Sequence, residues 1–95
     1  MAKYIILGNF TDQGIRTVKE TTKRVEALQA MGAKLGVKLH MYWTMGAYDW
    51  VAIADAPSDE AYMEFVFHAG SGGNARTTTL KAWTKEDVDK VVAKL

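Results

Sequence analysis

The sequence predicts an α+β domain in which helices cover one face of a four-stranded antiparallel sheet. Two observations lead to this fold class. Short β-rich runs alternate with segments of helical periodicity along the chain, and an antiparallel sheet of this kind needs helices on only one face. The chain has 95 residues, 48% of them hydrophobic, so we expect residues 1–95 to form one small domain with a thin core.

The first strand and the first helix are expected within residues 3–35. Residues 3–9 form a short run of clustered branched apolar side chains, which is typical of a buried strand. Thr11 is the expected N-cap of the helix that follows. From there to Leu35, apolar residues recur at spacings of three, four and seven, which places them on one helical face. Gly36 is expected to end this helix.

A β-hairpin is expected next, because residues 37–44 and 50–55 alternate with period two around a turn that contains Gly46. Seven residues are expected to point at the helices: Val37, Leu39, Met41, Trp43, Val51, Ile53 and Leu80. The opposite face is expected to carry His40, Tyr42, Trp50, Ala52, Ala54, Thr77 and Thr79, with Tyr4 or Ile6.

The C-terminal half predicts two more helices and a fourth strand. Ser58 is the expected N-cap of a helix that the segment AGSGGNA, residues 69–75, brings to an end. Residues 75–83 alternate as a strand, and Thr84 is the expected N-cap of a short terminal helix. The resulting order is the ferredoxin-like βαββαβ sandwich, also called the α-β plait, with an extra C-terminal helix.

The sheet face without helices carries the functional question. It must meet water, a ligand or another subunit, and a small domain with a largely apolar face gains stability by pairing. We therefore expect a homodimer or a higher homo-oligomer. A dry interface and a pocket between two sheets both remain open. Binding of a small, partly apolar molecule is assigned to His40, Tyr42, Tyr48, Asp49, Trp50, Arg76 and Thr79.

Three stretches resemble a known family. Residues 41–60, MYWTMGAYDWVAIADAPSDE, resemble the signature of the GYD domain family, in which a Gly-x-Tyr-Asp turn joins two strands ahead of an acidic helix start. Residues 70–83, GSGGNARTTTLKAW, and residues 11–16 resemble its Gly-rich loop with the final strand and its first helix entry. The resemblance implies a ferredoxin-like fold and oligomerisation as in dimeric α+β barrel proteins. Tyr48 and Asp49 are, by this analogy, either functional or turn-forming.

Whether the protein is an enzyme stays undecided from the sequence. One alternative is a cofactor-independent monooxygenase-like enzyme of the dimeric α+β barrel type, with His40 as the candidate catalytic base. Related enzymes of this type use Asn, Trp and His residues around the substrate, and here these would be Asn9, Trp43, Trp50 and His68. Another alternative is a purely structural or regulatory interaction module. For His68, a favourable position at a helix C-terminus is the simpler interpretation.

Composition narrows the partners. A net charge of +1 is too balanced to favour nucleic acid. With no cysteine and two separated histidines, we expect no metal and no other cofactor. No run approaches the roughly 20 apolar residues of a membrane span, and the N-terminus lacks a signal-peptide pattern, so a cytoplasmic protein is expected. The loop at residues 69–75 follows a helix, unlike a phosphate loop, although Arg76 and the loop amides remain able to bind a carboxylate.

Overall fold

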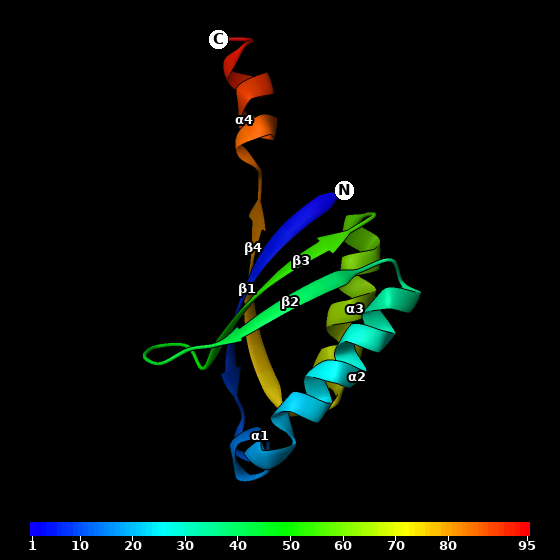
Figure 1. Ribbon diagram of the computed structural model, residues 1–95, viewed down its shortest axis with the longest axis vertical. Helices are drawn as coiled ribbons and strands as arrows, with labels where there is room; N and C mark the ends of the chain where they lie inside the picture. Colours follow the sequence, from blue (N-terminus) through cyan, green and yellow to red (C-terminus); the bar gives the residue numbers. More distant parts are fainter.

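The computed structural model describes residues 1–95 and has an α+β arrangement (Figure 1). The elements in chain order are β1 (Ala2–Phe10), α1 (Asp12–Arg16), the 3-10 helix η1 (Val18–Glu20), α2 (Thr21–Lys34), β2 (Lys38–Trp43), β3 (Trp50–Ala56), α3 (Asp59–Ser71), β4 (Ala75–Ala82) and α4 (Lys85–Val92). The strands form one sheet in the order β2-β3-β1-β4, and all neighbouring pairs are antiparallel. This arrangement confirms the ferredoxin-like fold with an additional C-terminal helix.

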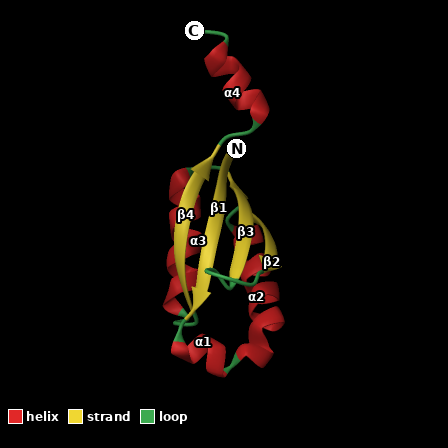
Figure 2. Cartoon of the chain, turned by 90° about the vertical axis from the view of Figure 1, so that its left-hand side faces the viewer, coloured by secondary structure: helices red, strands yellow, loops and turns green.

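Helices cover one face of this sheet. Figure 2 looks onto the other face, with α2 and α3 behind the strands. Small side chains at the centre of the sheet let the helices come close, and Ala52, Ala54 and Ala56 have no exposed surface. Around them, the core is completed by Tyr4, Ile6, Val37, Leu39, Trp50, Tyr62 and Phe65.

The first helical segment is interrupted near Thr17. The periodicity predicts one helix through residues 11–35, whereas the structure has α1, η1 and α2 in succession. The Thr17 hydroxyl donates to the carbonyl of Gln13 at 2.8 Å, and Arg24 donates to the carbonyls of Thr17 at 3.1 Å and Gly14 at 3.2 Å. The carbonyls of Gln13 and Thr17 also accept the backbone amides of Thr17 and Glu20. The side-chain hydrogen bonds add to these, so the break is stabilised locally.

Three of the four strands present the opposite face from the one expected. Burial alternates along β3 so that Trp50 and the alanines are buried, and the pairing of Ile6 with Ala52 and Thr79 places these residues on the helix side too. Leu80 pairs with Ile5 on the open face. The residues corrected to the helix side are Tyr4, Ile6, Trp50, Ala52, Ala54, Thr77 and Thr79, and those corrected to the open face are Val51, Ile53 and Leu80.

The predicted orientation of β2 is confirmed, since Leu39 is buried on the helix side and Met41 contacts the core. Elsewhere the assumption that the larger aliphatic residues face the helices was wrong. Alanines occupy the helix side of β3 because helices pack closely over small side chains. The β-branched residues of that strand lie on the open face instead, and this makes the open face more apolar than the sequence reading suggested.

Candidate functional site

A cavity of about 510 Å³ lies between the sheet and helices α2 and α3. Its wall is mainly aromatic and aliphatic and includes Phe10, Leu28, Met41, Trp50 and Phe65. Polar residues also border it, namely Thr21, Arg24, His68, Asn74, Arg76 and Thr77. An apolar hollow with a few polar groups, within the usual range of about 300–1,000 Å³, is the typical form of a small-molecule site.

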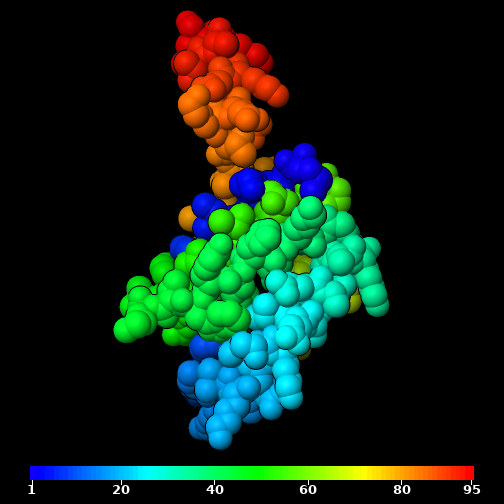
Figure 3. Space-filling model, viewed as in Figure 1, coloured from blue at the N-terminus to red at the C-terminus, as the bar shows by residue number.

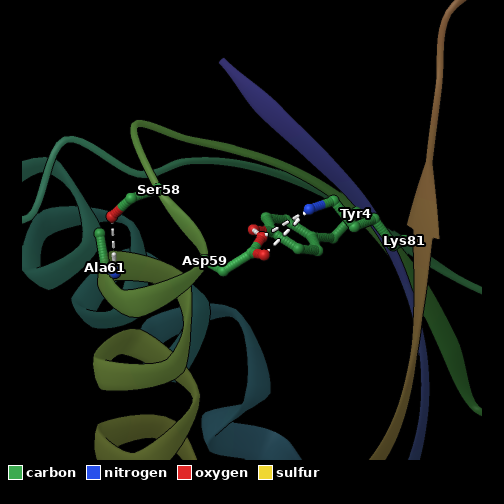
Figure 4. A network of polar contacts seen from close by, with 5 residues as sticks. All are labelled: Tyr4, Ser58, Asp59, Ala61 and Lys81. Carbon is green, nitrogen blue, oxygen red and sulfur yellow. Dashed lines mark hydrogen bonds and ion pairs between the residues drawn. The ribbon is translucent and has the colours of Figure 1, made fainter.

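A second, shallower recess lies where the start of α3 meets β1 and β4. There the Tyr4 hydroxyl donates a hydrogen bond to the Asp59 carboxylate, and Lys81 Nζ lies 2.9 Å from each oxygen of the same carboxylate (Figure 4). Tyr4 also stacks on Tyr62, with ring centroids 3.9 Å apart. The Tyr62 hydroxyl lies 2.8 Å from Thr79 Oγ1. Each polar group has a partner, so this cluster ties α3 to the sheet.

The electrostatics of the cluster follow from these contacts. Burial, followed by the hydrogen bond to Asp59, raises the pKa of Tyr4 to about 12. The hydrogen bond from Tyr4, followed by that from Lys81, lowers the pKa of Asp59. Burial raises the pKa of Tyr62. Tyr4 is therefore a neutral donor and Asp59 an ionised acceptor at neutral pH, which is the arrangement that stabilises the contact.

A pH-dependent contribution to stability is expected from this cluster. The pKa of Tyr4 is about 12 in the folded chain and 10.0 ordinarily, so its contribution is present below pH 10 and is lost as pH rises to about 12. The pKa of Asp59 is lowered on folding, so its contribution is lost as pH falls through the acid range. Tyr4→Phe should lower the thermal midpoint at pH 7 and flatten the alkaline fall.

Circular dichroism melts from pH 3 to 11 measure this effect. Tyr48→Phe is the matched control, because Tyr48 lies in the turn between β2 and β3, is 37% exposed and makes no hydrogen bond through its hydroxyl. An alkaline profile identical in the two variants would show that Tyr4 does not contribute as described.

The Gly-x-Tyr-Asp turn is fastened to β1. Gly46 has φ +114°, as expected for the turn. The Asp49 carboxylate accepts a hydrogen bond from the Phe10 amide at 2.9 Å, and the Asp49 amide donates to the Gly8 carbonyl at 2.9 Å. Thr44 Oγ1 donates to the Tyr48 carbonyl at 2.7 Å and closes the turn. Asp49 therefore has a structural contact that explains its place in the motif.

The Gly-rich loop is bound by the entry to α1. Thr11 donates from its amide to the Asn74 carbonyl at 3.1 Å and from its hydroxyl to the Gly73 carbonyl at 2.6 Å. Gln13 Nε2 donates to the Gly72 carbonyl and to Asn74 Oδ1, both at 3.0 Å. Two of the sequence stretches that carry the family resemblance are thus each other's hydrogen-bonding partners.

The seven residues expected to bind a ligand do not converge. His40 and Tyr42 lie on the open face, Tyr48 and Asp49 belong to the turn, and Thr79 contacts Tyr62 on the helix side. Trp50 and Arg76 border the cavity. His40 is exposed and its imidazole has no hydrogen-bond partner within the chain, so no side chain orients it as a base.

Other residues of the cavity were not singled out by sequence reasoning. Phe10, Leu28 and Phe65 have the periodicity of ordinary core positions, and nothing in that pattern distinguishes a filled core from the wall of a cavity. No group of three His, Asp or Glu side chains is placed to hold a metal ion. None of the helices is long and apolar enough to cross a membrane.

Comparisons with known proteins agree with this architecture. The model of the GYD domain family matches residues 4–92. A protein of Thermus thermophilus named "Glutamine synthetase and cystathionine beta-lyase binding protein" is 30% identical over 84 residues, which cover 86% of this chain and 88% of that protein. No solved structure matches the chain. The family match confirms what the three motifs suggested, and the chain belongs to the GYD domain family.

Proposed function

We propose that this protein is a homodimeric binding domain that takes up a small, largely apolar molecule. The cavity of about 510 Å³ between the sheet and helices α2 and α3 is the observation that supports the ligand. Aromatic rings from three elements border it, Phe10, Trp50 and Phe65, and they suit a planar or ring-containing ligand. Arg24 at its border suits an anionic substituent on that ligand.

The proposed dimer is supported by the surface area of the single chain. The chain exposes 6630 Å², whereas a compact monomer of its mass exposes about 5,400 Å². The excess is about 1,200 Å², and a stable interface buries about 800 Å² per partner. The open face offers a continuous apolar area for such an interface, formed by Ile5, Leu7, Val51, Ile53 and Leu80.

These two parts of the proposal use opposite faces of the sheet. The aliphatic residues at the centre of the open face favour a dry contact between two sheets about 10 Å apart. His40 and Tyr42 lie on the same face in β2, the strand at the edge of the sheet. The ligand is therefore assigned to the helix side, whereas the sequence alone left a dry interface and a pocket between the two sheets both open.

Filling the cavity tests the ligand proposal. The probe is 8-anilinonaphthalene-1-sulfonate, a ring-containing anion, titrated into the folded dimer and followed by its fluorescence. We expect Leu28→Trp, which places an indole in the cavity wall, to weaken binding at least tenfold. Leu35→Trp is the matched control, because Leu35 is also a half-buried leucine next to α2 but does not border the cavity. Equal affinity in the two variants, or no binding by the unaltered chain, would refute the assignment.

A second candidate function comes from the Thermus thermophilus relative, whose name describes binding to two enzymes. We propose as the alternative that this chain also binds metabolic enzymes of that kind. Sedimentation velocity of the chain mixed with glutamine synthetase or cystathionine β-lyase from its own organism tests this. Co-sedimentation with either enzyme would support the alternative, and independent boundaries with both would reject it.

A further inference from the structure

Helix α4 stands apart from the rest of the molecule. It continues beyond the end of β4 (Figure 1), and in the space-filling view its orange and red atoms extend well clear of the body (Figure 3). None of its residues is buried. Five large apolar side chains in this segment are exposed, which we call the apolar side of α4: Trp83 (62%), Val88 (46%), Val91 (59%), Val92 (55%) and Leu95 (99%).

Such a helix needs a partner to be stable. It has only eight residues, and isolated helices shorter than about 12 residues are marginal in water. Its own contacts are a capping box between Thr84 and Asp87 and an exposed ion pair between Lys85 and Asp89 at 2.8 Å. An exposed pair of this kind contributes little. The largest available stabilisation is therefore the burial of its apolar side.

The overall dimensions show that α4 makes the chain more extended than a compact domain of its length. The radius of gyration is 14.5 Å, whereas a compact domain of this length has about 12 Å. The longest dimension is 50 Å and the shortest is 16 Å. The chain is thus a thin body with an extension, a shape that a second copy would fill out.

We infer that α4 is an arm whose apolar side packs against the second copy of the chain, within the dimer proposed above. The arm leaves β4, the strand that carries Leu80 on the open face. It begins three residues after Ala82, which is about 10 Å of chain at most. A second sheet on the open face would lie about 10 Å away, so the arm starts next to the copy it would contact. Two-fold symmetry would make the exchange reciprocal.

The chain's own sheet and a membrane surface are less suitable partners for the apolar side of α4. Thr84 has φ −72° and ψ 165°, an extended conformation that carries the chain onward rather than back over its own sheet. A membrane-surface helix would carry a surplus of Lys and Arg on its polar side. Residues 85–95 instead contain three acidic and three basic residues. The balanced charge of the arm and its apolar side suit a contact with a second copy of the chain.

Isotope-filtered NMR with a spin label tests the arm directly. The chain has no cysteine, so Lys90→Cys on the polar side of α4 gives a single attachment point for a nitroxide. Spin-labelled chains at natural isotope abundance are mixed with ¹⁵N-labelled chains lacking the label. We expect broadening of ¹⁵N amide signals outside α4, because the label of one copy lies near the body of the other. A dimer without such broadening would overturn the arm but leave the dimer intact, whereas a monomeric protein would overturn both.

A pair of adjacent substitutions provides the second measurement. Val91→Asp places a charge on the apolar side of α4, and we expect it to weaken the dimer at least tenfold in sedimentation equilibrium. Lys90→Asp introduces the same residue on the polar side and should leave the dimer within twofold of the unaltered chain. Equal effects of the two substitutions would contradict an apolar contact made by the arm.

Discussion

Ile53→Lys is expected to convert the dimer into a folded monomer. Ile53 lies on the open face of a central strand, paired with Ile5 on one side and His40 on the other. The nearby Asp55 carboxylate on this face is already paired with Lys3 at 2.9 Å. Each copy would therefore bury a lysine without a free counter-charge, which costs several kcal/mol. We therefore expect the dissociation constant to rise at least a hundredfold, which corresponds to about 2.8 kcal/mol. Sedimentation equilibrium over a concentration series measures it.

The matched control is Ile15→Lys. Ile15 belongs to α1 and is 51% exposed, outside the open face. The same chemical change there should leave the dimer unaffected. The circular dichroism spectrum should stay native in both variants, because Ile53 is only half-buried in the single chain. A dimer that survives Ile53→Lys with unchanged affinity would rule out this face as the interface.

Gly8→Ala is expected to be strongly destabilising. A Cβ placed on Gly8 would lie 2.1 Å from a ring carbon of Trp50, and Trp50 is 8% exposed, so its ring has little room to move. Overpacking of this kind costs about 1–3 kcal/mol. Because Trp50 borders the cavity, the displaced ring should also weaken binding of the fluorescent probe. Urea unfolding monitored by circular dichroism gives the free energy.

Gly70→Ala is the control for that substitution. Gly70 lies within α3, and a Cβ placed there meets no atom within 4 Å. Alanine should therefore stabilise the helix by up to about 1 kcal/mol. The two glycine substitutions are thus expected to change stability in opposite directions. A Gly8→Ala variant as stable as the unaltered chain would show that Trp50 does not rest on Gly8.

The element order could be predicted from the sequence because its local signals are strong. Thr11, Ser58 and Thr84 each accept the hydrogen bond expected of an N-cap. The alternation in residues 37–55 marks both strands of the hairpin. The break at Thr17 could not be predicted in the same way, because it depends on hydrogen bonds that Arg24 makes seven and ten residues away.

The faces of the sheet were harder to predict. Period two shows which residues of β3 lie together, but it does not show which of the two sets faces the helices. Hydrophobicity alone predicts that Val51 and Ile53 face the helices and that Ala52 and Ala54 face away from them. In the structure the smaller residues lie beneath the helices, since they allow close packing, and the larger ones lie where we propose a second copy packs.

The cavity could likewise be predicted only in part from the sequence. Trp50 was identified, yet on the wrong face, and its companions Phe10 and Phe65 have the pattern of any core residue. A cavity depends on how far α2 and α3 stand from the sheet, and that separation is a tertiary property. The contacts of Asp49 with Phe10 and Gly8 of β1 likewise join residues 39 and 41 positions apart, so the motif alone left its role open.

Sedimentation equilibrium of the unaltered chain at micromolar concentration is the most direct test of the proposal that a second copy covers the bare side of the sheet. We expect a mass of twice the 10.5 kDa of one chain. A homogeneous species of 10.5 kDa that stays folded throughout the concentration series would contradict it.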